Sequence, residues 1–85
     1  MAKLAKGFHD ERYRELIGKL VAERKRLGLS QRELADKIGQ HQQFVSRYEL
    51  GERRLDIIEF IDVVVALALK PSHLVADIIT TYGEG

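Results

Sequence analysis

The sequence has 85 residues, of which 45% are hydrophobic, enough for one small domain but too few for an added catalytic or ligand-sensing domain. It contains no cysteine, which excludes a disulfide framework and a thiolate metal site. The amino terminus lacks the apolar core of a signal peptide, and no apolar run is long enough to cross a membrane. We therefore expect a cytoplasmic protein with no membrane partner.

The net charge of +1 hides an uneven distribution of charge along the chain. Residues 1–54 hold thirteen of the fourteen Lys and Arg residues and eight acids, which gives +5, whereas residues 55–85 hold one Lys and five acids, which gives −4. Such a basic half is typical of a surface that binds a polyanion, and equally of an ordinary solvated face. Residues 1–9 are expected to form a flexible basic arm that either contacts phosphates or has no role.

A first helix is predicted from Asp10, a good N-cap residue, to Leu27, and Gly28 is suited to end it. Arg24 falls on the inward face of this helix. Because an unpaired buried charge is costly, Arg24 either pairs with an acid or extends outward to solvent. The apolar residues that recur at helical spacing on the inward face are Tyr13, Leu16, Ile17, Leu20, Val21 and Leu27.

Residues 30–50 have the pattern of two short helices joined by a tight turn. Ser30 and Glu33 have the spacing of a capping box, so the first of these helices is expected to begin at Gln31. Gly39 can adopt the left-handed conformation that lets the chain leave this helix sharply. The inner face of the helix that begins at Gln31 is formed by Leu34, Ala35 and Ile38.

The second helix of this pair is expected over residues 42–50, after a turn from Gly39 to His41 and before another stop signal at Gly51. Its inward side chains, Val45 and Tyr48, have i, i+3 spacing. Two helices in this arrangement typically place the second one in a groove of duplex DNA. The polar side chains left on its outer face are Gln42, Gln43, Ser46 and Arg47.

The segments LSQRELADKIG and QQFVSRYELGERR, separated by a three-residue turn, resemble the helix-turn-helix of phage repressor and Cro proteins, the XRE family. The resemblance covers roughly residues 13–80. It implies an all-α, compact five-helix, lambda-repressor-like domain, which we place at residues 10–82. The matching positions, in register without a gap, are Ser30-Gln31, Leu34-Ala35, Gly39, Val45-Ser46, Glu49 and Gly51.

The resemblance implies a role for each polar position of the motif. Residues that match Gln42, Gln43 and Arg47 read base edges in the major groove of the family's DNA complexes. Residues that match Gln31 and Ser46 approach the DNA backbone. For Arg47 the residue type alone leaves two roles open, because a guanidinium can bind either guanine or a phosphate.

The family also supplies a partner for Arg24, because an Arg at this position pairs with the Glu that matches Glu49. The sequence departs from the family's pattern at three positions. His41 stands where a Ser or Thr cap is usual, and we expect it to face the DNA backbone. Leu55 stands where Pro is common, and Ala68 where Gly is common.

After Gly51, Asp56 and Glu59 have the spacing of another capping box, so a further helix begins here. Arg53 and Arg54 precede this helix closely. Positive charge beside the free N–H groups of a helix N-terminus suits a phosphate. Both arginines are therefore expected to contact the DNA backbone, the alternative being an exposed loop pair.

The helix predicted from Ile57 to Leu69 is more apolar than a surface helix requires. The stripe expected to face the core consists of Ile57, Phe60, Val63, Val64 and Leu67. A second apolar stripe beside it needs a cover, because soluble monomers seldom expose large apolar patches. The cover is a last helix over about residues 71–82, a second subunit, or both. The residues expected in such a homodimer interface are Ile58, Ile61, Val65, Leu74, Val75, Ile78 and Ile79.

Nothing in the sequence indicates an enzyme, a cofactor or a small-molecule ligand. The histidines His9, His41 and His73 lie in separate segments without metal-ligand spacing, and there is no Gly-rich phosphate loop or nucleophile elbow. The expected function is a homodimeric regulator, a repressor, that binds double-stranded DNA at a palindromic operator. The alternatives are a restriction-modification controller, an antitoxin partner, or a helix-turn-helix used only for protein contact. The polar outer face of residues 42–50 argues against the last of these.

Overall fold

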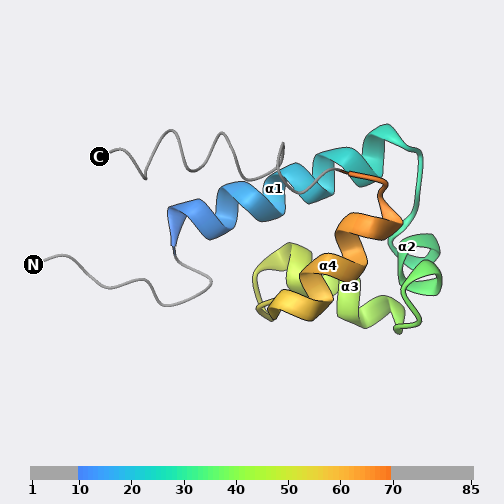
Figure 1. Ribbon diagram of the computed structural model, residues 1–85. Helices are drawn as coiled ribbons and strands as arrows, with labels where there is room; N and C mark the ends of the chain where they lie inside the picture. Colours follow the sequence, from blue (N-terminus) through green and yellow to red (C-terminus); the bar gives the residue numbers. More distant parts are fainter. Residues whose placement is uncertain (1–9, 70–85) are drawn as a thin grey trace, which may run out of the picture.

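The computed structural model describes residues 10–69, which form four α-helices. These are α1 (Glu11–Arg26), α2 (Gln31–Lys37), α3 (Gln42–Leu50) and α4 (Ile57–Ala66). The longest helix, α1, lies along one side, and the three shorter helices gather beside its carboxyl-terminal half (Figure 1). The all-α class is thus confirmed over this range, whereas the expected fifth helix and the arm of residues 1–9 lie outside the described residues. Within residues 10–69, no helix has both the length and the apolar character needed to cross a membrane.

Side-chain caps explain where two of the central helices begin. At the start of α2, Glu33 N donates to Ser30 Oγ at 2.9 Å and Ser30 N donates to Glu33 Oε1 at 2.7 Å. At the start of α4, Glu59 N donates to Asp56 Oδ1 at 2.7 Å and Asp56 N donates to Glu59 Oε1 at 3.0 Å. Both predicted capping boxes are therefore confirmed. The helix between them, α3, follows the N-cap residue His41, whose side chain makes no capping hydrogen bond within residues 10–69.

The helix-turn-helix has the boundaries that the sequence predicted. Gly39 and Gly51 adopt left-handed backbone conformations, with φ of 70° and 83°, at the ends of α2 and α3. A residue with a side chain rarely adopts such angles, so glycine at these two positions lets the chain turn without strain.

The predicted end of α4 at Leu69 is wrong, because the helix stops at Ala66. Ala68 adopts a left-handed conformation with φ of 57°, the conformation that glycine has at the other helix ends. Its N–H donates to Val65 O at 3.0 Å, and the N–H of Leu69 donates to Val64 O at 3.0 Å. These bonds satisfy carbonyls of the last turn and direct the chain away from the helix axis.

All four described helices contribute to one hydrophobic core. Its buried members are Ile17, Leu20, Leu34, Ala35, Phe44, Val45, Tyr48, Leu55, Val63, Val64 and Leu67. The hydroxyl of Tyr48 is buried in this core with no hydrogen-bond partner among the described residues. Its burial raises the pKa of Tyr48 well above the usual value of 10.0.

Two residues that the sequence assigned to the core are exposed instead. Ile57 is 66% exposed and Leu27 is 41% exposed. Ile57 is the first residue of α4, and helical side chains tilt toward the N-terminus, so its side chain extends past the end of the helix. Leu27 follows the last turn of α1, beyond Arg24, the last buried residue of that helix. Periodicity alone does not account for these end effects.

Candidate nucleic-acid interface

The outer face of α3 presents three exposed polar side chains. Gln42, Gln43 and Arg47 are exposed, and none of the three side chains forms a hydrogen bond or ion pair with another described residue. Ser46 lies on the same helix and is half-buried. This face therefore carries amide and guanidinium groups whose hydrogen-bonding capacity is available to another molecule.

The opposite face of α3 is anchored in the core. Val45 and Tyr48 are fully buried, and Phe44 is nearly so. The rings of Phe44 and Tyr48 meet edge to face, with centroids 5.6 Å apart and an interplanar angle of 65°. The two aromatic residues are thus packing residues, and they fix the backbone beneath the polar outer face.

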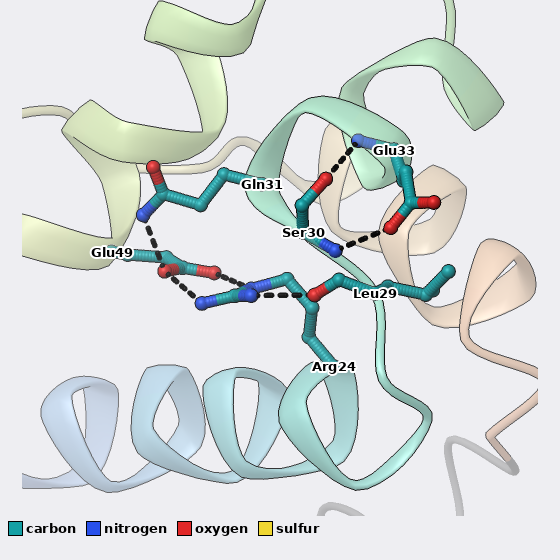
Figure 2. Close-up of polar contacts among 6 residues, drawn as sticks. All are labelled: Arg24, Leu29, Ser30, Gln31, Glu33 and Glu49. Carbon is teal, nitrogen blue, oxygen red and sulfur yellow. Dashed lines mark hydrogen bonds and ion pairs between the residues drawn. The ribbon is translucent and has the colours of Figure 1, made fainter.

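A buried ion pair ties the end of α3 to α1. Arg24 Nε donates to Glu49 Oε2 at 2.7 Å, and a terminal nitrogen of Arg24 donates to Glu49 Oε1 at 3.0 Å (Figure 2). The other terminal nitrogen donates to Leu29 O at 2.7 Å. Both charged side chains are less than one-tenth exposed, and the hydrogen bonds to Glu49 raise the pKa of Arg24 further. The pair that the sequence proposed is present, with the backbone of Leu29 as an additional acceptor.

Gln31 shares this carboxylate. Its Nε2 donates to Glu49 Oε1 at 2.9 Å, so the first residue of α2 is joined to the end of α3 (Figure 2). The sequence placed Gln31 at the DNA backbone and did not anticipate this contact. An amide nitrogen carries two N–H groups, so a bond to Glu49 leaves one for another acceptor. The sequence shows only that Gln31 follows the capping residue Ser30 directly and so begins α2. The contact itself depends on how α2 and α3 pack, which brings Gln31 to Glu49.

Arg53 is bound within the domain. Its two terminal nitrogens donate to the two carboxylate oxygens of Glu59 at 2.8 and 2.7 Å. Its guanidinium carbon lies 4.7 Å from the ring centroid of Phe44, a cation–π distance. The ion pair lowers the pKa of Glu59 and raises that of Arg53. The sequence assigned Arg53 to the DNA backbone and did not anticipate that Glu59, six residues away, would accept from both terminal nitrogens.

Arg54 and Tyr13 fix the connection between α3 and α4 against α1. The guanidinium carbon of Arg54 lies 5.5 Å from the ring centroid of Tyr13, and Arg54 remains exposed. Leu55 N donates to the hydroxyl of Tyr13 at 3.0 Å. His41, which the sequence also assigned to the DNA backbone, is exposed as well.

Helix α4 carries exposed apolar side chains. Ile58, Ile61 and Val65, which we call the α4 stripe, are 62%, 44% and 70% exposed. Their spacing puts them along one side of the helix. The other residues assigned to a dimer interface, Leu74, Val75, Ile78 and Ile79, lie outside the described residues.

Comparison with known proteins identifies the family. A family model described as helix-turn-helix matches residues 20–74. A solved XRE-family like protein from Pseudomonas syringae pv. tomato str. DC3000 is 38% identical, with a TM-score of 0.81 over 87% of this chain and 90% of that chain. A comparison with curated proteins found no match. The family match covers more than half of the chain and the solved protein shares its fold, so the chain belongs to the XRE family of helix-turn-helix DNA-binding regulators.

Proposed function

We propose that this protein is a homodimeric repressor that inserts α3 into the major groove of a palindromic operator. The observation that carries this proposal is the outer face of α3, where Gln42, Gln43 and Arg47 are exposed above a fixed, buried inner face. The buried inner face fixes the backbone from which these side chains extend, so less conformational entropy is lost when they contact base edges.

The residue types on this face match the hydrogen-bonding patterns of two bases. A Gln amide can accept from N6–H and donate to N7 of adenine at once. The guanidinium of Arg47 can donate to both O6 and N7 of guanine. Gln42 and Gln43 are in the first turn of α3, the end that enters the groove in this class of domain. Each half-site should therefore contain at least one fixed adenine and one fixed guanine.

The flanking polar residues support contacts to the DNA backbone. Gln31 and Ser46 match family positions that approach the DNA backbone, and His41 is the exposed N-cap residue of α3, so we assign all three to phosphates. Since no side chain within residues 10–69 caps α3, its first N–H groups can also donate to a phosphate. Arg54 adds an exposed positive charge, whereas Arg53 is already bound to Glu59.

The α4 stripe supports self-association. Three neighbouring apolar side chains that are between 44% and 70% exposed favour burial against another surface. A two-fold dimer would present two copies of α3, and its half-sites would lie about one helical turn of DNA apart.

Selection of duplexes from a random pool tests the proposal directly. The selected sequences should converge on a palindrome, and fluorescence anisotropy should show affinity falling log-linearly with salt, by orders of magnitude over a few-fold rise. A helix-turn-helix used only for protein contact would retain no duplex even at low salt. A flat salt dependence would also contradict the proposal.

A further inference from the structure

We infer that Arg53 is a positioning residue for the reading helix α3 and not a phosphate contact. In this role, its contacts with Glu59 and Phe44 hold the first turn of α3 at a fixed orientation against the start of α4. The inference rests on the proposed function, because it concerns the helix assigned to the major groove. It assigns specificity for the operator to a side chain that touches no base.

The contact with Glu59 uses the full fork of the guanidinium. The two parallel bonds, at 2.8 and 2.7 Å, fix the plane and the direction of the Arg53 side chain, which a single bond would not. Glu59 is itself held, because its Oε1 also accepts from Asp56 N at 3.0 Å in the capping box of α4. Arg53 is therefore attached to the capped first turn of α4.

The contact with Phe44 transmits this position to α3. The guanidinium lies 4.7 Å from the centroid of the Phe44 ring, and Phe44 follows directly after the proposed base-reading pair, Gln42 and Gln43. The ring is also in edge contact with Tyr48. Phe44 is thus held from the core on one side and by Arg53 on the other, and any tilt of the first turn of α3 must disturb this stack.

The first turn of α3 needs such support because it lacks a capping side chain. Helices α2 and α4 both begin with a reciprocal capping box, whereas the side chain of His41 makes no capping bond within the described range. A missing N-cap destabilises a helix end and allows it to fray. The stack of Arg53 on Phe44 restrains the turn by side-chain contacts in place of a cap.

Electrostatics also disfavours a phosphate role for Arg53. The carboxylate of Glu59 lies within hydrogen-bonding distance of both terminal nitrogens and offsets the charge that a phosphate would attract. A phosphate would have to displace Glu59 or approach an ion pair with little net charge. The neighbouring Arg54 is exposed and pairs with no carboxylate among the described residues. It is therefore the matched control for Arg53.

Four variants test this inference: Arg53→Gln, Arg53→Lys, Glu59→Gln and, as a matched control, Arg54→Gln. Affinity is measured for an operator duplex selected from a random pool and for a scrambled duplex of the same composition. Positioning predicts that the first three variants each lower the ratio of the two affinities by roughly tenfold, about 1.4 kcal/mol. Their salt slopes should equal that of the unmodified protein, and combining Arg53→Gln with Glu59→Gln should add little.

A phosphate role predicts a different pattern. Arg53→Gln would then weaken both duplexes alike and lower the salt slope by about one, as expected here for Arg54→Gln. Arg53→Lys would retain most binding, and Glu59→Gln would strengthen binding to both duplexes by releasing the charge of Arg53. This pattern would overturn the inference.

Amide hydrogen exchange without DNA separates failure of the inference from failure of the proposed function. If Arg53 positions α3, the α3 amides that donate to carbonyls of its first turn should exchange faster in Arg53→Lys than in the unmodified protein, with the amides of α1 unchanged. If no duplex is selected at all, the proposed function fails, and this measurement still decides the positioning role. Unchanged exchange in α3 would overturn it.

Discussion

Glu49 joins three segments of the chain through one carboxylate. It accepts from Arg24 of α1 and from Gln31 of α2, and it belongs to the last turn of α3. The three helices that form and support the candidate interface therefore meet at a single buried charge. Its energetic weight depends on burial, because the same pair in water would contribute little.

Breaking this ion pair should destabilise the protein strongly. We expect Arg24→Met or Glu49→Gln to lower the free energy of unfolding by about 3 kcal/mol, because each change leaves a buried polar or charged partner uncompensated. Urea denaturation measures the effect. The double variant Arg24→Met with Glu49→Gln should lose less than the sum of the two single changes. A free energy of unfolding that stays unchanged in every variant would show that the pair is not buried in solution.

Substitution of Arg47 tests whether this side chain contacts a base. We expect Arg47→Ala to weaken binding to the selected operator by roughly 1–3 kcal/mol and to relax the preference for guanine at one position. Anisotropy titrations with the operator and with single-base variants of it measure both effects. Equal weakening on the operator and on a scrambled duplex would instead assign Arg47 to a phosphate. The same result for Gln42→Ala and Gln43→Ala would remove α3 from the major groove.

At the scale of the helix, the start of α3 is the weak point of the motif. We expect His41→Ser to raise the free energy of unfolding by about 1 kcal/mol, because the Ser hydroxyl can accept from an N–H of the first turn. Thermal denaturation monitored by circular dichroism measures the gain. His41→Ala, which offers no acceptor, is the control and should bring no such gain. If both variants melt together, the first turn is already satisfied by another group.

Helix starts were predictable from sequence where short-range chemistry decides them. The capping boxes at Ser30 and Asp56 each involve a residue three positions away, so the sequence contains both partners. The ends of the apolar stripes were not predictable from sequence. Leu27 and Ile57 have the helical spacing of core residues, yet both lie beyond the buried part of their helices. The end of α4 depended on a left-handed Ala68, a conformation that its residue type does not announce.

The candidate site divides in the same way. The outer face of α3 followed from periodicity, which holds because Phe44, Val45 and Tyr48 bury the opposite face. The Arg24 and Glu49 pair was reached only through resemblance to a family, since the two residues are 25 positions apart. The contacts of Gln31 with Glu49 and of Arg53 with Phe44 were missed, because they depend on how helices pack and not on spacing within one helix.

At the scale of the whole molecule, the α4 stripe governs the proposed association. We expect Ile61→Lys to leave the helices intact and to weaken both self-association and operator binding, because it places a charge in the middle of an apolar surface. Sedimentation across a range of concentrations measures the association. Asp62→Lys, an exposed position beside the stripe, is the control and should leave it unchanged. If the unmodified chain sediments as a monomer at high micromolar concentration, the homodimer is wrong.

The buried hydroxyl of Tyr48 allows local unfolding of this protein to be followed by ultraviolet absorbance. The chain has three tyrosines and no tryptophan, so phenolate absorbance can be followed without interference from indole. Because burial raises the pKa of Tyr48 above 10.0, its contribution to stability is complete below that pH and is lost as the pH rises further. After a jump to alkaline pH, Tyr48 should ionise only as fast as α1 and α3 separate, a slow phase that Tyr48→Phe should abolish. Prompt ionisation of every tyrosine would show that water already reaches the hydroxyl. The rate of the slow phase would give the rate at which α1 and α3 separate.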